Sequence, residues 1–443
     1  MRKIFLPVFC FALLAGCSAA KAPKNVILII GDGMGFNQME AASCWIYGQE
    51  GSLIAQKFPI KAAVATFSAS GHGYDPQKAA TDFEYLKLKP TDSAAAATAM
   101  ACGVKTRNGA IGVDTLGMPL PNVFEQAEKV GRSTGVVTSV PFSHATPAGF
   151  IAHDTSRGNY HIIAEQMLLQ SAAEVVVGGG HPFYNFDGEL RAVPKFEYVD
   201  EMVWQRVTKD GAGADADGDG VPDPWTFVDS RAGFQQVLAA PPKRLFGVAP
   251  VASTLQFSRR GGENQRVPFE PPLTDNMPSL AELSSAALAV LEKNPKGFYV
   301  MIEAGAIDWA CHANHSARLI EEMRDFENTV KTVVEWVESR SSWEETLLIV
   351  TADHETGYLW GPNAGNIEEN GNKRAFYPPI VNRGRNSLPD MQWHSDNHSN
   401  QLVPLYAKGK GAEQLLKTVR GKDSIRGDYI DNTDIPAVLR TFL

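Results

Sequence analysis

The residues of this 443-residue chain that could do chemistry are Asp, Glu and His side chains at or just after the ends of short apolar segments. Carboxylates and imidazoles placed in this way are common ligands of divalent metals: mixed Asp and His sets suit Zn²⁺, and carboxylates with a hydroxyl and water suit Mg²⁺. For any one of them, a capped turn or a hydrogen-bonded histidine is the commoner explanation, but convergence of several favours a metal site. The candidates are Asp32, Glu303, Asp308, His312, Asp353, His354 and His398.

A serine at the start of an alanine-rich segment is a second candidate, within Thr91-Asp92-Ser93-Ala94-Ala95. The ordinary explanation of this motif is a helix cap, with either Asp92 or Ser93 satisfying the free N–H groups. The chemical role of Ser93 would be attack on a bound anion such as phosphate, because a helix N-terminus offers free N–H donors and the positive end of the helix dipole. The motif by itself favours the cap.

The elements that must position these side chains follow from hydrophobic patterning. Strands buried on both faces of a parallel sheet read as short, β-branched, nearly continuous apolar runs, and six are present: 25–31, 134–140, 174–180, 298–303, 346–354 and 402–409. Helical patterns lie between them at 94–102, 120–130, 159–170, 280–293 and 316–340. This alternation predicts an α/β three-layer sandwich with a central, mostly parallel sheet. The carboxyl ends of its strands share one edge, where the polar candidates should meet.

Composition sets limits on partners and on domain plan. The chain has 41 Lys and Arg against 50 Asp and Glu, a formal charge of −9, which argues against a nucleic-acid partner held by a broad basic surface. We expect one catalytic domain over residues 25–443. Within it, residues 181–278 are rich in Pro, Gly, Asp and Arg with weak periodicity, so we expect an irregular inserted region that covers one face and takes no part in the main sheet.

The first 16 residues are typical of an export signal, with Arg2 and Lys3 before an apolar stretch too short to span a bilayer comfortably. The sequence Leu14-Ala15-Gly16-Cys17 resembles a bacterial lipoprotein signal. We therefore expect cleavage before Cys17, lipid on that residue, a linker over 17–24, and a location in the periplasm or on the outer membrane. Cleavage of an ordinary secretory signal after Ala19 or Ala20 is the alternative.

The cysteines do not indicate a disulfide framework. Cys44, Cys102 and Cys311 remain after the signal, an odd and widely spaced set that allows at most one disulfide. Buried thiols that pack as small hydrophobic groups are expected.

An acidic loop within the inserted region is a further metal candidate. Asp215, Asp217, Asp219 and Asp223 stand at positions 1, 3, 5 and 9 of a segment with Gly at position 6, which resembles an EF-hand or thrombospondin-type calcium loop. Position 12 is Thr226 where a bidentate Glu is expected. A solvated acidic turn is the alternative, and we expect Ca²⁺ bound by the four aspartates and Val221.

Seven motifs, in order across most of residues 24–409, together resemble the alkaline phosphatase family. They are KNVILIIGDGMG from Lys24, TDSAA from Thr91, GVKT from Gly103, HATP from His144, TSR from Thr155, IEAGAID from Ile302 and TADHE from Thr351. The resemblance implies that family's sandwich fold and hydrolysis of phosphate monoesters to an alcohol and inorganic phosphate. It also implies a phosphoserine intermediate, two zinc ions, one magnesium ion and, commonly, a homodimer.

The resemblance further implies a role for each residue. Ser93 resembles the nucleophile and Arg157 the guanidinium that clamps phosphate oxygens. The implied metal ligands are Asp353, His354 and Ser93 for one zinc, Asp308, His312 and His398 for the other, Asp32 bridging a zinc and magnesium, and Glu303 and Thr146 for magnesium. His394 competes with His398, but the strand expected after His398 matches the one that follows the ligand in the family.

Two residues implied to lie near the substrate differ from the enterobacterial form of the family. His144 stands where that form has an acidic residue, which raises the question of zinc against magnesium in the third site. Trp309 stands where that form has Lys, and loss of a cation near the phosphate should weaken product binding and speed its release.

Three alternatives compete with this interpretation. A phosphodiesterase of the same superfamily would share the two-zinc core. A non-catalytic metal-binding surface lipoprotein would not need Ser93 or Arg157. The glycine run Gly31-Asp32-Gly33-Met34-Gly35 hints at a dinucleotide fingerprint, but Phe36 stands at its final glycine position.

Overall fold

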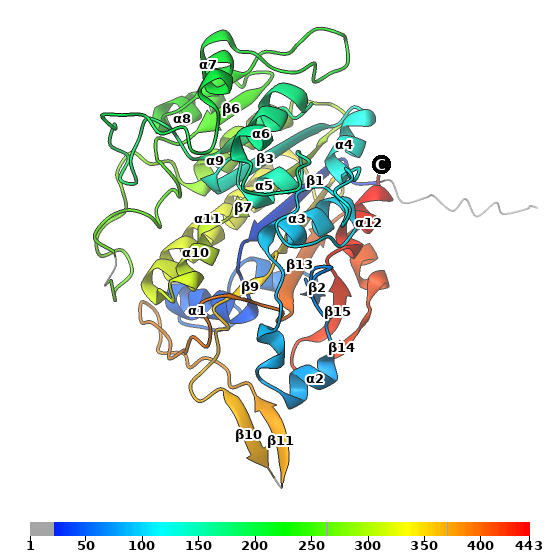
Figure 1. The fold of residues 1–443 in the computed structure, drawn as a ribbon, viewed down its shortest axis with the longest axis vertical. Helices are drawn as coiled ribbons and strands as arrows, with labels where there is room; N and C mark the ends of the chain where they lie inside the picture. The colour runs from blue at the N-terminus through cyan, green and yellow to red at the C-terminus, as the bar shows by residue number, and fades with distance from the viewer. Residues whose placement is uncertain (1–21, 263–264, 370) are drawn as a thin grey trace, which may run out of the picture.

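A computed structural model describes residues 22–262, 265–369 and 371–443. An 11-stranded sheet runs through the molecule, with helices on both faces (Figure 1). Its order is β14 (Gly421–Asp423), β15 (Gly427–Asp431), β2 (Ile60–Ala65), β13 (Val403–Gly409), β8 (Thr346–Thr351), β1 (Asn25–Gly31), β7 (Phe298–Ala304), β3 (Ser133–Pro141), β4 (Val175–Gly179), β6 (Leu245–Val248) and β5 (Thr226–Val228). β13 is antiparallel to β2 and β8, and β14 is antiparallel to β15; the other pairs are parallel. The predicted α/β sandwich is confirmed.

Two groups of helices cover the sheet. One comprises α3 (Ser93–Cys102), α4 (Val123–Lys129), α5 (Ala145–Gly149) and α12 (Asp434–Arg440), and the other α1 (Phe36–Tyr47), α8 (Arg231–Ala239), α9 (Leu280–Leu291), α10 (Ala306–His312) and α11 (Ser316–Arg340). Neighbouring strand residues point to opposite faces. Tyr299 of β7 packs against Phe124 of α4, and Phe298 packs against Trp336 of α11, so the two groups lie on opposite faces.

The remaining elements lie around this framework. They are α2 (Pro76–Thr81), α6 (Tyr160–Glu165), α7 (Glu201–Asp210), the short antiparallel pair β9 (Glu355–Thr356) and β12 (His398–Ser399), and three 3-10 helices at Ala55–Lys57, Tyr85–Lys87 and Ala412–Thr418. The hairpin of β10 (Gly365–Glu369) and β11 (Asn372–Phe376) projects from one end of the molecule (Figure 1). A π-helical turn, Gln166–Gln170, continues α6 over the predicted helix 159–170.

The prediction that residues 181–278 take no part in the main sheet is wrong. β6 and β5 come from this region and extend the sheet beyond β4. All four residues of β6 are buried, and Phe246 packs against Trp204 and Phe227. Strands of four and three residues are too short to show a clear periodicity, which is why the sequence pattern did not reveal them.

Two elements have boundaries that differ from the prediction. The strand expected to run to His354 ends at Thr351, so Asp353 and His354 lie in the turn that follows. The helix expected from residue 120 begins at Val123, because Asn122 and Glu125 form a capping box there.

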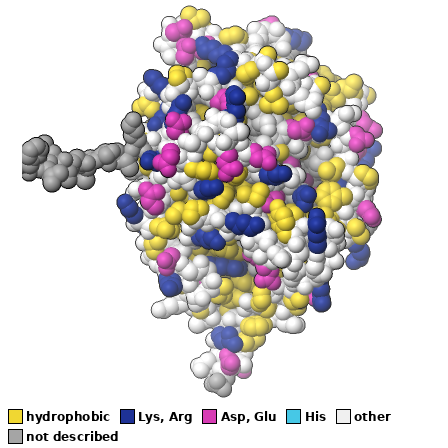
Figure 2. Space-filling view, turned by 180° about the vertical axis from the view of Figure 1, so that it is seen from behind, with side chains coloured by type: hydrophobic (Ala, Val, Ile, Leu, Met, Phe, Trp, Pro, Cys, Tyr) yellow, Lys and Arg dark blue, Asp and Glu magenta, His cyan; other side chains and the backbone are white. Residues whose placement is uncertain are grey.

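The thiols agree with the expectation from the sequence. Among the described residues, Cys44, Cys102 and Cys311 are buried and form no disulfide. The proposed signal segment and Cys17 lie outside the described residues. No helix within the described ranges has both the length and the apolar character needed to cross a bilayer. Basic and acidic side chains are interspersed over the face shown in Figure 2.

Candidate active site

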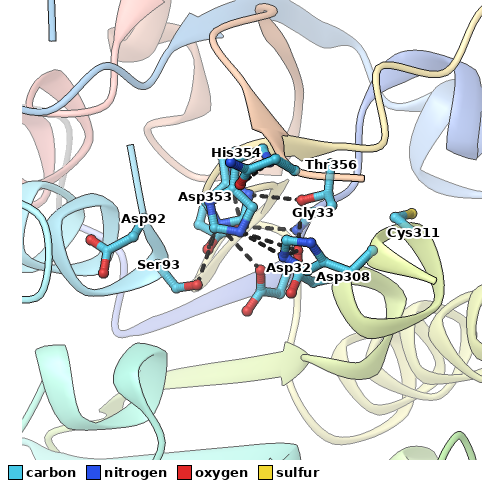
Figure 3. Close-up of polar contacts among 12 residues, drawn as sticks. Asp32, Gly33, Asp92, Ser93, Asp308, Cys311, Asp353, His354 and Thr356 are labelled. Carbon is cyan, nitrogen blue, oxygen red and sulfur yellow. Dashed lines mark hydrogen bonds and ion pairs between the residues drawn. The ribbon is translucent and has the colours of Figure 1, made fainter. Parts of the chain in front are cut away.

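Adjacent central strands bring the predicted carboxylates together. β1 lies between β7 and β8 and is parallel to both. Ile30 of β1 pairs with Glu303 on one side and with Thr351 on the other. Asp32 follows β1, and Asp353 follows β8 at the same edge. Ligand atoms of Asp32, Asp353 and His354 lie within 4.8 Å of one another, and all three side chains are buried. Figure 3 shows them converging with Ser93 on one point.

Backbone groups fix the orientation of Asp353. Its Oδ1 accepts hydrogen bonds from the N–H groups of Gly33, at 3.1 Å, and His354, at 2.8 Å. Its Oδ2 has no hydrogen-bond partner among the described residues, and it lies 3.2 Å from His354 Nε2. That nitrogen is also 3.6 Å from Asp32 Oδ1 and 3.2 Å from Ser93 Oγ. One imidazole nitrogen therefore faces two carboxylates and the serine hydroxyl.

A second group surrounds Asp308 on α10. Its Oδ1 lies 3.5 Å from His398 Nε2 and 3.4 Å from His312 Nε2, and the two imidazole nitrogens are 3.0 Å apart. Thr356 donates a hydrogen bond of 2.6 Å to the same Asp308 oxygen. His394 is not in this group, because its ring packs edge-on against Phe83 at 5.1 Å. Of the two histidines left open by the sequence, the structure places His398 beside Asp308 and His312.

Ser93 is the first residue of α3, and its neighbour Asp92 supplies the cap. Asp92 Oδ1 accepts from the N–H of Ala95, at 3.0 Å, which leaves the Ser93 hydroxyl free to point into the site. Asp92 Oδ2 accepts from Arg157 Nη1 at 3.1 Å and from the N–H of Gly109 at 2.9 Å. Asp92 thus holds the nucleophile candidate and the arginine together. The cap that the sequence favoured for this motif is present, but it leaves Ser93 available.

A third group of buried polar atoms lies at the ends of β3 and β7. Thr138 donates to Glu303 Oε2 at 2.5 Å. Glu303 Oε1, Thr146 Oγ1 and Asp32 Oδ1 have no hydrogen-bond partner among the described residues, and neither does Nδ1 of nearby His144. Buried polar atoms are nearly always paired, so a cluster of orphaned oxygens is the local environment that a hard cation such as Mg²⁺ would complete.

The pKa values of these groups also indicate that the site lacks positive charge to balance its carboxylates. Burial raises the pKa of Asp32 well above its usual value, and the charges of Asp353, Asp308 and Glu303 raise it further. Burial and Asp308 raise the pKa of Asp353 to about 8. Burial also holds the pKa of His354 well below its usual value, and the neighbouring His398 and His312 add to this effect. Clustered buried carboxylates with neutral imidazoles form a metal-binding environment.

The two residues that depart from the enterobacterial pattern lie side by side. The rings of His144 and Trp309 are 6.0 Å apart between centroids. Burial, followed by the charge of Arg157, lowers the pKa of His144 to about 3, so the imidazole is neutral. A neutral imidazole can act as a metal ligand or a hydrogen-bond partner.

The acidic loop of the 181–278 region is already paired with a positively charged side chain, Lys243. Single oxygens of Asp215, Asp217 and Asp223 lie within 4.8 Å of one another. Lys243 Nζ lies 2.7 Å from Asp217 Oδ2 and 2.5 Å from Asp223 Oδ1. Asp219 accepts from the N–H of Val221, at 2.8 Å, as in an ordinary Asx turn. Calcium binding here stays a prediction, and the ion would have to displace the ammonium group.

Three side chains that contact the predicted residues were not assigned a functional role from the sequence: Asp92, which orients Arg157, Thr138, which binds Glu303, and Thr356, which binds Asp308. The sequence held a signal for Thr138, which lies within the predicted strand 134–140, but none for Thr356. Thr138 pairs directly with Glu303 in the parallel register of β3 and β7. Thr356 lies two residues beyond His354, on a strand of two residues too short to be seen in a pattern.

A serine at a buried helix start, an arginine held beside it and neighbouring groups of carboxylates and imidazoles define a hydrolase of phosphate esters. A family profile described as alkaline phosphatase matches residues 23–389. The chain is 31% identical to alkaline phosphatase 4 of Bacillus subtilis, over 90% of this chain and 87% of that protein. It is 30% identical to the alkaline phosphatase of Escherichia coli, over 77% and 72%. The chain belongs to the alkaline phosphatase family, and it is a phosphomonoesterase.

The fold agrees with this assignment. The solved structure of alkaline phosphatase from the Antarctic bacterium TAB5 matches this chain with a TM-score of 0.64 at 25% identity, over 96% of this chain and 98% of that one. Mutants of the TAB5 enzyme have been solved with Mg bound in a site called M3.

Proposed function

We propose that the chain hydrolyses phosphate monoesters through a phosphoserine at Ser93, with two zinc ions and one magnesium ion. One observation carries the proposal: the Ser93 hydroxyl lies 3.2 Å from His354 Nε2, within a buried set of carboxylates and imidazoles and beside Arg157. Asp353, His354 and Ser93 would hold one zinc, and Asp308, His312 and His398 the other. Asp32 would bridge a zinc and magnesium, with Glu303 and Thr146 completing the magnesium site. The orphaned oxygens and the TAB5 mutants with Mg support metal ions at these positions.

The first half of the reaction uses groups positioned by α3. Two phosphoryl oxygens would bind the planar guanidinium of Arg157, which Asp92 holds in place, and the N–H groups at the start of α3 would face the remaining charge. Ser93 Oγ gives up its proton to solvent water and bonds to phosphorus. The bond from phosphorus to the alcohol oxygen breaks in line, and the alcohol takes up a proton as it leaves.

The second half restores the enzyme. Water attacks the phosphorus of phosphoserine, and the bond from phosphorus to Ser93 Oγ breaks. Inorganic phosphate departs, and Ser93 Oγ takes up a proton to become a hydroxyl again. The bound metals would supply Lewis acidity, lowering the pKa of the serine hydroxyl and of water and neutralising the leaving oxygen. Because the residues assigned here would contact only the phosphoryl group, hydrolysis of diverse esters is expected.

The test combines metal content with trapping of the intermediate. Elemental analysis of the purified mature protein should find zinc and magnesium, and chelation should abolish activity that selective zinc return restores. Acid quenching with a ³²P-labelled monoester should trap label on wild-type protein and none on Ser93→Ala. Zinc-free protein with full turnover, or wild-type protein that never carries label, would refute the mechanism.

Simple assays distinguish the proposed function from two alternatives. A phosphodiesterase would prefer bis(nitrophenyl) phosphate over nitrophenyl phosphate. A non-catalytic metal-binding lipoprotein would hydrolyse neither, and Ser93→Ala would change nothing. Asp92, Ser93 and Arg157 joined in one arrangement at the site support the monoesterase.

We also propose that the mature chain is exported, is lipid-anchored through Cys17 in the periplasm or on the outer membrane, and forms a homodimer. Mass spectrometry of the mature N-terminus and sedimentation of the delipidated protein test these points. Calcium at the acidic loop is tested by equilibrium dialysis. The Asp217→Ala, Asp219→Ala double variant should lose bound Ca²⁺, and unchanged binding would refute the site.

A further inference from the structure

Four half-buried or buried aromatic rings continue outward from His144, beside the phosphoryl-binding arginine. The imidazole of His144 and the ring of Tyr160 are nearly parallel, with centroids 6.2 Å apart and planes at 16°. The ring of Trp309 lies 6.0 Å from the same imidazole. Tyr198 packs edge-on against Tyr160 at 5.1 Å, and Phe257 packs edge-on against Trp309 at 6.3 Å. We call the set of Tyr160, Tyr198, Trp309 and Phe257 the aromatic wall.

The wall lies next to the phosphoryl site. Tyr160 follows Arg157 by three residues and begins α6. His144 directly precedes α5, and α5 packs against α3, the helix that begins at Ser93. Trp309 directly follows Asp308 on α10. Tyr160, Trp309 and Phe257 are each only half-buried, so all three remain partly accessible to a ligand.

Hydrogen bonds from outside the metal-ligand groups hold the Tyr160 side of the wall. The Ser143 hydroxyl donates to the backbone oxygen of Tyr198 at 2.7 Å. His161 Nε2 lies 2.8 Å from the backbone oxygen of Phe196. These contacts fasten the segment that carries Tyr198 to both ends of the segment that carries His144 and Tyr160, so the rings are placed before any ligand arrives.

The Trp309 side is held by Ser139 of β3 and by a buried ion pair. Ser139 Oγ accepts from the N–H of Gly305, at 2.9 Å, at the start of the helix that carries Trp309. The backbone oxygen of Ser139 accepts from Leu255, also at 2.9 Å, two residues before Phe257. Two residues beyond Phe257, Arg259 pairs with Glu321 at 2.8 Å, and both side chains are almost fully buried. Rigid rings bind a flat ligand with little loss of side-chain entropy.

We propose that the aromatic wall binds the alcohol portion of the ester and favours planar, unsaturated rings over saturated ones, with Tyr160 and Phe257 as binding residues. This inference rests on the proposed function, because it assigns the neighbouring surface to the group that leaves phosphorus. Two kinds of substrate share the required chemistry, aryl-bearing phosphates and nucleoside monophosphates. Stacking and edge-on contacts with a ring are expected to raise kcat/KM for the planar ester about three- to tenfold.

The test compares benzyl phosphate with cyclohexylmethyl phosphate. Both release a primary alcohol of similar acidity, so the intrinsic reactivity of the two esters is matched and only the flatness of the ring differs. Wild-type protein should show the larger kcat/KM for benzyl phosphate. Tyr160→Leu and Phe257→Leu should each reduce the ratio of the two kcat/KM values toward one, whereas Tyr160→Phe, which keeps the ring, should retain it.

The control is Phe186→Leu, a substitution of an exposed ring in the 181–278 region, which should leave both kcat/KM values unchanged. The inhibition constants of benzylphosphonate and cyclohexylmethylphosphonate on wild-type protein measure the same preference without turnover or a variant. If the kcat/KM of a nucleoside 5′-monophosphate falls in Tyr160→Leu as that of benzyl phosphate does, the proposal extends to nucleobases. If it does not change, the proposal is restricted to aryl-bearing phosphates.

The failures can be told apart. If both esters are hydrolysed equally by wild-type protein and both phosphonates inhibit equally, the aromatic wall has no such role and the proposed function stands. If both Leu variants fold and keep the full benzyl preference, the assignment of Tyr160 and Phe257 is wrong. If wild-type protein hydrolyses neither ester, the proposed function fails, and this inference fails with it.

Discussion

Replacing Glu322 by Gln should stabilise the protein at alkaline pH. This carboxyl lies on α11, is 5% exposed, and its Oε1 has no hydrogen-bond partner among the described residues. Burial raises its pKa to about 8 from 4.5, and the charges of Asp325 and Glu321 add to this shift. Arg259 and the N–H of Phe257 oppose the shift but do not cancel it. Glu322 is therefore protonated in the folded protein at neutral pH.

The sign and size of the effect follow from linkage. The folded state binds the Glu322 proton more tightly than the unfolded state, so the free energy of unfolding falls as the pH rises from 4.5 toward 8. With these two pKa values, the fall between pH 6 and pH 9 is about 2.6 kcal/mol. A glutamine cannot ionise, and its amide keeps an acceptor for the N–H of Phe257. The free energy of unfolding of Glu322→Gln, relative to that of wild type, should thus be about 2 to 3 kcal/mol higher at pH 9 than at pH 6.

The assay is urea unfolding of wild type and variant at pH 6 and pH 9, with the metal content held constant. The matched control is Glu335→Gln on the exposed face of the same helix, where the carboxylate makes a solvent-exposed pair with Lys331. That control should shift stability by less than about 0.5 kcal/mol at either pH. A Glu322→Gln difference that is the same at pH 6 and pH 9 would refute the reasoning, because the buried carboxyl would then titrate as in the unfolded chain.

Three further predictions concern the site. Trp309→Lys should lower the inhibition constant for inorganic phosphate about tenfold, the effect of one charge-assisted contact, and an unchanged constant would contradict it. Thr356→Val removes the hydrogen bond to Asp308 and should weaken zinc affinity roughly 10- to 100-fold in competition with a chelator, while Thr356→Ser should restore it. Metal removal should lower the melting temperature more at pH 9 than at pH 6, because burial raises the pKa of Asp32 and Asp353 in the metal-free fold. An equal loss at both pH values would count against it.

The central sheet was predictable because its strands are long and apolar. Runs such as 25–31 and 298–303 have no competing helical interpretation, and parallel pairing then requires Asp32 and Glu303 to share an edge. Strands away from the centre of the sheet were not predictable. β2 carries three alanines and β15 carries two aspartates, so neither shows the β-branched density that marks a buried strand, and β5 has only three residues.

Contacts between side chains also divide into those that the sequence could predict and those that it could not. The pairing of Asp308 with His312 follows from their spacing on one helix. The proximity of His398, 90 residues later, depends on a two-residue strand pair with β9 that leaves no pattern in the sequence. The same holds for Lys243 at the acidic loop, since an ammonium group that closes a loop from 20 residues away gives no local signal.

The positions of these groups in the fold imply different tolerances for change. Asp32, Glu303 and Asp353 are attached to β1, β7 and β8, whose register is fixed by six paired residues on each side of β1. A slip of one residue would turn every side chain of such a strand to the other face, so the geometry around phosphorus is set by the whole sheet. Tyr160 and Phe257 lie outside the strands, in segments held by a few hydrogen bonds. If the aromatic wall binds the alcohol as proposed, substitutions there should alter the preferred alcohol without moving the atoms that act on phosphorus.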